Sequence, residues 1–407
     1  MSHASSPSAA PHAVSRPAAA NPNREILLSV TCTALAYLGV GLPLAVLPDW
    51  VHRDLGFSTV LAGLAISIQY VATIISRGLV GPMADTAGPR LSILVGFACC
   101  LASGIAALGA AHLASASPSL ALVPLFLSRI ALGFGESMIG TGAIAWGIAR
   151  TQPALTARVI SWNGMATYGA IAAGAPLGAW LFGIGGIGAI GLALALTGIA
   201  GFAFAWPQPT TRSIASQRMP FHHVLRRVTP YGIALALGAI GFGAISAFIA
   251  LDYSARGWAG APLALSAFGL SFVAARLLFV RQIERLGGLR VALIFLGIEI
   301  VGLLLVWQAP VASIATLGAG ATGFGFALIF PALGMIVVDL VPPQNRGSAI
   351  GAYSLFTDVA LCATGPAAGY LVGTSGYQAP FLLGAVSALA GAVMVVGLMQ
   401  AARHRQA

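Results

Sequence analysis

The sequence predicts an all-α integral membrane protein with twelve transmembrane helices in two pseudo-symmetric six-helix bundles. Only 7% of the 407 residues are charged, whereas about a quarter are charged in a typical soluble chain. Hydrophobic residues make up 58% of the chain, and its uncharged runs are as long as one membrane crossing or a simple multiple of it. A helix needs roughly 20 residues to cross the hydrocarbon core of a bilayer. Lipid is therefore the predicted solvent.

Twelve spans fit the uncharged runs. The run 228–251 suits one helix, and the run 159–211 holds two, with a turn in the glycine-rich stretch 183–188. Residues 1–25, rich in Ser, Ala, Pro and His, are predicted to be a disordered cytoplasmic tail. The predicted spans are 26–48, 59–83, 91–112, 120–147, 158–182, 187–206, 229–251, 263–283, 290–308, 311–339, 347–373 and 379–401.

Arginine placement predicts the orientation. All 20 basic residues are arginines. With both termini in the cytoplasm, fifteen of them fall in cytoplasmic segments, three (Arg77, Arg129 and Arg276) fall within spans, and only Arg53 and Arg256 fall outside, as the positive-inside rule requires. The predicted location is the plasma membrane of a bacterium, its inner membrane, crossed many times.

The longest polar connector divides the chain into two halves. The predicted organisation is an N-terminal tail 1–25, an N-terminal bundle 26–206, a cytoplasmic loop 207–228, a C-terminal bundle 229–401 and a tail 402–407. The pattern Arg77-x7-Asp85-x2-Gly88 after the second span recurs as Arg276-x7-Glu284-x2-Gly287 after the eighth. Repeated halves are typical of secondary transporters, whose substrate site lies between the halves near the membrane midplane.

These motifs resemble those of a known family. The loop Gly81-Pro-Met-Ala-Asp85-Thr-Ala-Gly88-Pro-Arg90 resembles the signature loop between helices 2 and 3 of the major facilitator superfamily. Arg129 with Gly133 resembles its helix 4 motif, and the run 129–147 is similar to YhhS-type permeases within it. The resemblance covers nearly all of residues 26–401. It implies that two bundles rock around a central cavity.

The resemblance also implies an inner gate. Asp85 is expected near the start of helix 11, where a helix N-terminus favours an anion, and Arg90 is expected as a charge partner in the same gate. The alternative is that these charges cap helix ends and follow the orientation rule. The predicted gating residues are Gly81, Asp85, Gly88, Arg90, Arg276 and Glu284.

Ionisable residues deep in the spans are the candidates for proton coupling, because a charge at the bilayer centre costs about 2.5–3.5 kcal/mol on insertion scales. The chain has no lysine, and its histidines lie outside the spans or at their edges, so a coupled proton needs a carboxylate. Arg129 and Glu136 share one stripe of helix 4, about 10 Å apart, and need a relay or separate partners. The predicted proton-coupling residues are Glu136, Arg129 and Asp358.

Each of these residues also has a structural interpretation. Arg129 and Glu136 can belong to ion pairs that hold the N-terminal bundle together. Asp358 lies on a stripe of small and polar residues that either packs on a neighbouring helix or faces the cavity. Glu299 lies on helix 9, which the resemblance places away from the cavity, so a packing role or an interface with another chain is expected.

Two further sets of residues follow from depth and residue type. Polar and aromatic side chains at mid-depth are predicted to line the substrate cavity: Tyr37, Gln69, Tyr70 and Tyr168. Glycine and proline inside the spans are predicted hinges, with fixed kinks as the alternative, since neighbouring helices can satisfy the freed carbonyls. These are Gly174, Pro176, Gly178, Gly365 and Pro366.

The predicted function is secondary active transport, as proton-coupled efflux of a small molecule. The helix 5 segment 164–178 resembles the glycine/proline motif of proton-coupled exporters in the superfamily; a proton symporter or a facilitator for a small polar solute is the alternative. An integral membrane enzyme is disfavoured, because the sequence has no metal-binding helix motif, nucleophile elbow or phosphate loop. We expect no cofactor and no metal. The expected partners are a small-molecule substrate, protons and the lipid bilayer, without nucleic acid, and the chain is expected to act as a monomer.

Overall fold

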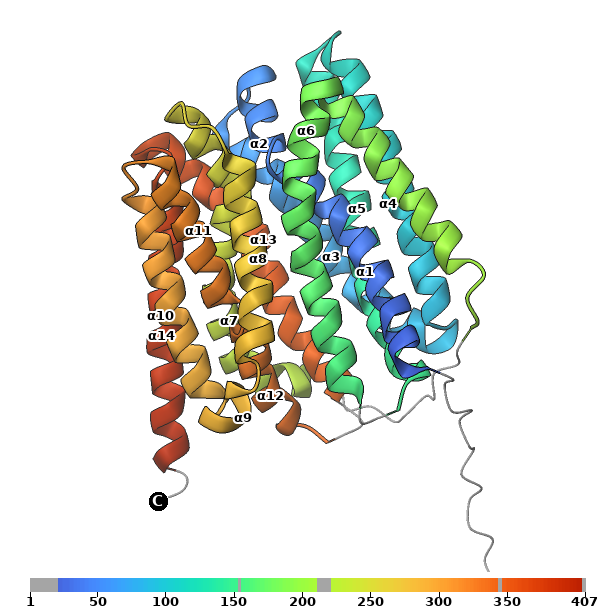
Figure 1. The fold of residues 1–407 in the computed structure, drawn as a ribbon, viewed down its shortest axis with the longest axis vertical. Helices are drawn as coiled ribbons and strands as arrows, with labels where there is room; N and C mark the ends of the chain where they lie inside the picture. Colours follow the sequence, from blue (N-terminus) through green and yellow to red (C-terminus); the bar gives the residue numbers. More distant parts are fainter. Residues whose placement is uncertain (1–20, 153–154, 211–220, 343–345, 405–407) are drawn as a thin grey trace, which may run out of the picture.

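The computed structural model describes residues 21–152, 155–210, 221–342 and 346–404. Within these ranges every regular element is a helix, and eleven helical stretches are long and apolar enough to cross a membrane. The long helices run side by side, and both ends of the described chain lie at the same end of the bundle (Figure 1). We call this end the terminal face and the opposite end the far face.

The first half of the chain forms one group of packed helices. Here α4 packs on α5 and α6, and α1 packs on the same two helices. A short helix α2 (Leu47–Asp49) and a π-helical turn η1 (Trp50–Asp54) lead from α1 to α3 at the far face. The long helices of this first group are α1 (Pro22–Leu44), α3 (Thr59–Thr86), α4 (Pro89–Ala114), α5 (Pro118–Arg150) and α6 (Thr156–Ala205).

The 50-residue α6 contains two spans. Its helical geometry fails at Gly185 and Gly186, where Gly186 has φ 58° and ψ −151°. Only glycine adopts such a conformation at low cost. The chain reverses there at the far face, so the eleven stretches comprise twelve spans, as the sequence predicts (Figure 1).

The second half forms a second group. In it α7 packs on α13 and α14, and α10 packs on α11 and α14. Its elements are α7 (Phe221–Ala255), α8 (Ala261–Phe279), α9 (Gln282–Leu286), α10 (Gly288–Trp307), α11 (Ala312–Phe326), α12 (Ile329–Asp339), α13 (Arg346–Ser375) and α14 (Ala379–His404).

The predicted span 311–339 is interrupted between α11 and α12. Pro331 has no N–H, so the carbonyl of Ala327, four residues earlier, lacks its helical donor. The two groups meet where α13 packs on α3 and where α6 packs on α8. The predicted division at 207–228 falls partly outside the described residues and stays a prediction.

Candidate functional site

A buried polar network joins α3 to α5. Arg129 donates through Nε to the carbonyl of Ala65 at 3.0 Å and through Nη2 to Oε1 of Gln69. The amide nitrogen of Gln69 donates to Oε2 of Glu136 at 3.4 Å. The side chains of Gln69, Arg129 and Glu136 are all buried. The amide of Gln69 therefore links the arginine to the carboxylate, which lie two helical turns apart on α5.

Two of the predicted cavity residues lie near this network. The hydroxyl of Tyr37 on α1 would be 3.6 Å from a methyl group placed on Gly140, one turn from Glu136 on α5. Tyr70 follows Gln69 on α3 and is buried. Gln69 itself is fully buried and satisfied by protein partners, so in this conformation it links helices.

An ion pair joins the two groups. Arg77 of α3 donates through Nε to Oδ2 of Asp358 on α13. The side chain of Asp358 is 8% exposed and that of Arg77 is 28% exposed, so the pair lies mostly out of water. Arg77 follows Gln69 by eight residues, about 12 Å along α3. The same helix therefore supports both carboxylates that the sequence singles out.

Arg276 occupies the position in the second half that corresponds to Arg77, and its surroundings differ. Its Nε donates at 3.1 Å to the carbonyl of Ala327, the group that Pro331 leaves without a helical donor. Its guanidinium lies 4.8 Å above the ring of Phe272. A methyl group on Gly164 of α6 would overlap Nη1, so this glycine leaves room for the guanidinium. Within the described part of the chain Arg276 forms no ion pair.

Tyr168 of α6 inserts its ring among four phenylalanines of the second group. It stacks on Phe272 with ring centroids 3.7 Å apart. Phe242, Phe268 and Phe326 surround the same ring at centroid distances of 5.6, 6.4 and 6.2 Å. The sequence predicts Tyr168 as a cavity residue but does not single out the phenylalanines, of which only Phe268 and Phe272 show helical spacing on one face.

The predicted gating loop is described in part. Gly88 has φ 93° and forms the turn before α4. Arg90 donates to the carbonyls of Ala205, at 3.4 Å, and Trp206, so its contacts lie within the first group. Glu284 on α9 is exposed. The side chain of Asp85 and the site of Gly81 fall outside the described side chains, so the gating role stays a prediction.

The two predicted glycine/proline hinges pack differently. Gly365 lies against Gly63 of α3, and a methyl group on either glycine would overlap the other's carbonyl. This contact therefore holds α13 against α3, across the two groups. Gly174 instead lies against Gly41 of α1, inside the first group, as does Gly178 against Leu42. Pro176 and Pro366 lie within α6 and α13.

Glu299 is buried inside the second group. Its side chain has no exposure, and neither carboxyl oxygen has a hydrogen-bond partner in the described part of the chain. A methyl group on Gly241 of α7 would lie 2.5 Å from Oε1 and one on Gly238 would lie 3.4 Å from Oε2. The expected alternative of an interface with another chain is wrong for Glu299, because α7 covers it.

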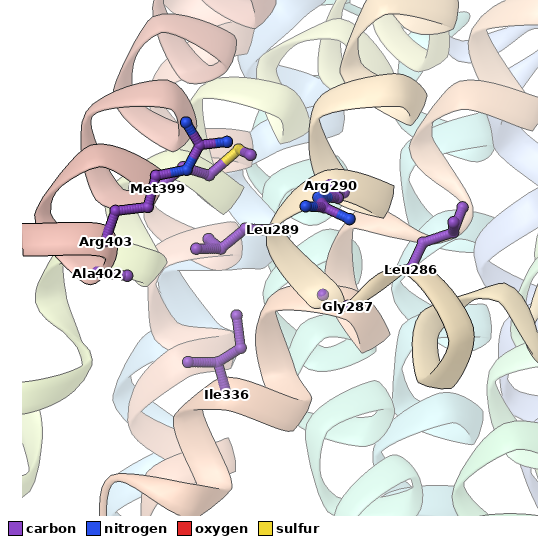
Figure 2. Close-up of a pocket in the computed structure, with 9 residues that line it drawn as sticks. Leu286, Gly287, Leu289, Arg290, Ile336, Met399, Ala402 and Arg403 are labelled. Atoms are coloured by element: carbon purple, nitrogen blue, oxygen red, sulfur yellow. The ribbon is translucent and has the colours of Figure 1, made fainter. Parts of the chain in front are cut away.

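A pocket of about 260 Å³ opens at the terminal face of the second group (Figure 2). Arg290 at the start of α10 and Arg403 at the end of α14 line it, with Ile336 of α12. Its lining residues all belong to one group and include neither Glu136 nor Asp358. A movement of the two groups relative to each other would not open or close this pocket. It is separate from the networks of Glu136 and Asp358. Among the described residues no group of His, Cys, Asp and Glu could hold a metal ion.

Comparisons with known proteins agree with this architecture. The chain is 49% identical over 384 residues to an uncharacterized MFS-type transporter of Pseudomonas aeruginosa (strain LESB58), covering 94% of this chain and 95% of the relative. It is 50% identical over 379 residues to one of Burkholderia pseudomallei (strain 1106a), covering 92% of each. Among solved structures it is similar to the nucleoside transporter NupG, with a TM-score of 0.71, 17% identity, and coverage of 92% of this chain and 99% of that one. The human organic anion transporter MFSD10 (TETRAN) gives a TM-score of 0.68 at 17% identity, with the same coverage.

The model of the Major Facilitator Superfamily matches residues 30–263 and 231–407, which together cover both halves. The family match and the relatives agree with a membrane transporter of twelve spans. The chain is a membrane transport protein that belongs to the Major Facilitator Superfamily.

Proposed function

We propose that this transporter exports a small molecule in exchange for protons, as a monomer in the bacterial inner membrane with both termini in the cytoplasm. The observation that supports coupling is the placement of two buried carboxylates against one helix. Glu136 is bonded to α3 through Gln69 inside the first group, and Asp358 is bonded to α3 through Arg77 across the two groups. Buried ionisable groups in spans mark proton and substrate pathways by default.

Asp358 supplies a direct link between protonation and movement. Its ionised carboxylate accepts from Arg77 and so joins α13 to α3. Protonation removes the negative charge and with it most of the attraction that holds this contact. A proton that reaches Asp358 therefore favours separation of the two groups on the terminal side of the midplane.

Glu136 is the second proposed proton site, inside the first group. As a carboxylate it accepts from the amide nitrogen of Gln69, whose oxygen accepts from Arg129. A protonated Glu136 loses its negative charge and gains an O–H donor, while one oxygen can still accept from that amide nitrogen. Proton binding therefore removes the charge assistance from this hydrogen bond and weakens the link between α5 and α3 that runs through Gln69.

Alternating access is supported by the contacts of the far half. Thr59 donates to the carbonyl of Gly369 at 2.8 Å, and Ser266 donates to that of Ala172 at 2.8 Å. Nearer the far face Ser254 donates to Asp49 at 3.2 Å, and His52 and Tyr377 lie 3.1 Å apart at Nε2 and the hydroxyl. All four contacts join the first group to the second. They close the far side, and release of substrate there requires that they separate.

A proton symporter or facilitator for a small polar solute is the second candidate, favoured by the polar character of the Gln69 network. The two candidates differ in the direction of proton movement relative to substrate. Because both use the same carboxylates, a measurement of that direction separates them.

The test uses inverted membrane vesicles and a substrate found by screening a strain that lacks its own exporters. We expect substrate addition to release protons from vesicles holding the wild-type protein, together with uphill substrate uptake. Glu136→Gln is expected to abolish proton release. Glu299→Gln is the matched control, since it removes another buried carboxylate that contacts neither network, and we expect it to retain coupling. Wild-type proton release in Glu136→Gln would refute the coupling proposal, and proton uptake with substrate would favour symport.

A further inference from the structure

Arg276 is a buried cation of the second group. Its side chain is 92% buried, since 8% of its surface is exposed. An arginine stays protonated at this depth, so it requires a negative partner. The described residues provide none within ion-pair distance. Of the three guanidinium nitrogens, only Nε donates to an acceptor among those residues. Nη1 and Nη2 lie beside Gly164 of α6, next to the place that a Cβ on this glycine would occupy.

The internal repeat indicates which position would hold an acid partner for Arg276. Aligning the glycine/proline element 174–178 with 365–369 places Thr167 of α6 at the position of Asp358 on α13. The two arginines of the repeat are Arg77 and Arg276, so the pair Arg77–Asp358 has as its counterpart the pair Arg276–Thr167. Thr167 lies one turn from Gly164 on α6 and its hydroxyl donates at 3.1 Å to the carbonyl of Asn163. One half of the molecule thus supplies its own acid, and the other half lacks it.

The surroundings of Arg276 are aromatic. The guanidinium lies over the ring of Phe272. The ring of Phe242 stacks on that of Phe268, with centroids 5.2 Å apart, and on that of Phe326, with centroids 5.8 Å apart. Stacked and edge-on ring pairs add stabilisation beyond their buried area. We infer that the transported substrate is an organic anion with an apolar, ring-containing body: its acid group pairs with Nη1 and Nη2 of Arg276 and its body packs on these four phenylalanines. This inference rests on the proposed transport function and names its substrate class.

Tyr168 shows how such a ring would fit. Its phenol ring comes from the first group, whereas the four phenylalanines belong to the second group. When the groups rock apart, Tyr168 moves away from the cluster and leaves a face of four rings beside a free guanidinium. In the conformation described here, the tyrosine ring occupies the place that we assign to the substrate's ring.

A purely structural role for Arg276 accounts for less of this geometry. That role is to donate to the Ala327 carbonyl freed by Pro331, and it uses Nε alone. It leaves the two Nη nitrogens and the glycine that makes room for them without an explanation. The two roles also differ in what they predict for a variant that places a carboxylate on α6 beside Arg276. A binding role predicts that this carboxylate weakens the binding of an anion, and a structural role does not.

The experiment measures equilibrium binding to the purified protein without a proton gradient. The probes are 2-naphthoate, its neutral amide 2-naphthamide and the cation 2-naphthylmethylammonium, which share one ring system. We expect the acid to bind at least about tenfold more tightly than the amide or the ammonium, as a charge-assisted contact to a buried arginine requires. In Arg276→Gln the preference for acid over amide is expected to disappear.

The second pair of variants avoids removal of the arginine. Thr167→Asp supplies the acid that Asp358 supplies in the other half, and we expect it to lower naphthoate binding about tenfold or more, while Thr167→Asn leaves binding as in wild type. Naphthoate binding that is absent, or no tighter than that of the amide, overturns the inference, as does unchanged naphthoate binding in Thr167→Asp. Because binding is measured without a gradient, loss of proton coupling in Glu136→Gln leaves this result intact, so the two proposals fail separately.

Discussion

Arg77 and Arg276 hold equivalent positions in the two halves of the chain, yet their environments differ. Arg77 reaches across to α13 and pairs with Asp358. Arg276 faces α6 across the other junction and meets a glycine and an aromatic cluster instead of an acid. The repeat therefore provides two similar cations and neutralises one. In our proposals the balanced charge takes part in the conformational cycle, and the charge without an acid partner binds a ligand.

The largest expected loss of stability comes from breaking the ion pair between Arg77 and Asp358. Asp358→Asn leaves Arg77 as a buried cation without a partner, which costs about 3 kcal/mol, the lower end of the range for broken buried pairs because Arg77 is partly exposed. We expect a clear drop in the thermal unfolding midpoint of the purified protein. Arg77→Gln combined with Asp358→Asn should recover most of that loss, since no charge then stays unpaired. A double variant as unstable as the single one would show that packing, not charge, holds this junction.

The corresponding substitution in the second half is Arg276→Gln, and we compare its effect on stability with that of Asp358→Asn. Arg276→Gln removes one charge-assisted hydrogen bond to Ala327, worth about 1.5–3 kcal/mol, and it also removes a buried charge without an acid partner, which is favourable and offsets that loss. We therefore expect its unfolding midpoint to stay near that of wild type, in contrast to Asp358→Asn. Thermal unfolding of both variants in the same detergent tests this. A loss as large as that of Asp358→Asn would indicate that Arg276 has a partner that the contacts described above do not include.

The next effect concerns the two glycine/proline elements. Gly365→Ala places a methyl group on the Gly63 carbonyl between the two groups, and overpacking of this kind costs about 1–3 kcal/mol. Because the strain falls on a junction that opens in the cycle, we expect the far side to open. A cysteine at Thr59 should then react faster with a membrane-impermeant thiol reagent, in a background where the four native cysteines are replaced.

Gly174→Ala is the matched control for that experiment. It places the same methyl group against Gly41 inside the first group, where no opening relieves it. We expect lower stability without increased labelling at position 59. Equal labelling in the two variants would remove the distinction between an element that joins the groups and one that lies within a group.

A smaller effect is expected from the hydrogen bonds that close the far half. Thr59→Val and Ser266→Ala each remove one side-chain donor to a carbonyl across the junction, worth about 1 kcal/mol. Each is expected to raise the population of the form that is open at the far face by a similar factor, as measured by the same thiol labelling of a cysteine at position 377. If only one of them has an effect, the two junctions do not open together.

The smallest effect comes from the exposed pair Asp339–Arg346 at the terminal face. Its side chains are 72% and 53% exposed, with nitrogen and oxygen 3.6 Å apart. Surface pairs of this kind contribute about 0–1 kcal/mol and are screened by salt. Asp339→Asn should leave the unfolding midpoint within a degree or so of wild type at physiological salt, and a larger shift would point to a role in the gate.

Much of the fold follows from the sequence because a bilayer imposes simple length and polarity rules. The spans, the turn near Gly186 and the repeated halves can be predicted from the sequence for that reason. The site can be predicted only in part. Glu136, Arg129 and Asp358 stand out as charges in apolar runs, whereas the partners Gln69 and Arg77 depend on how α3 crosses α5 and α13. The cluster around Tyr168 draws rings from four helices, and no spacing in one chain indicates which helix faces converge.

The tight reversal at Gly185–Gly186 bears on how the protein is made. Two residues join the fifth span to the sixth, so the emerging chain has no hydrophilic stretch there to pass through the membrane separately. Antiparallel helices with so short a connection form a hairpin. We therefore expect the fifth span to enter the bilayer together with the sixth, as one unit. A glycosylation acceptor or epitope tag inserted at this reversal should interfere with biogenesis itself, whereas the same insertion in the central connector should be tolerated.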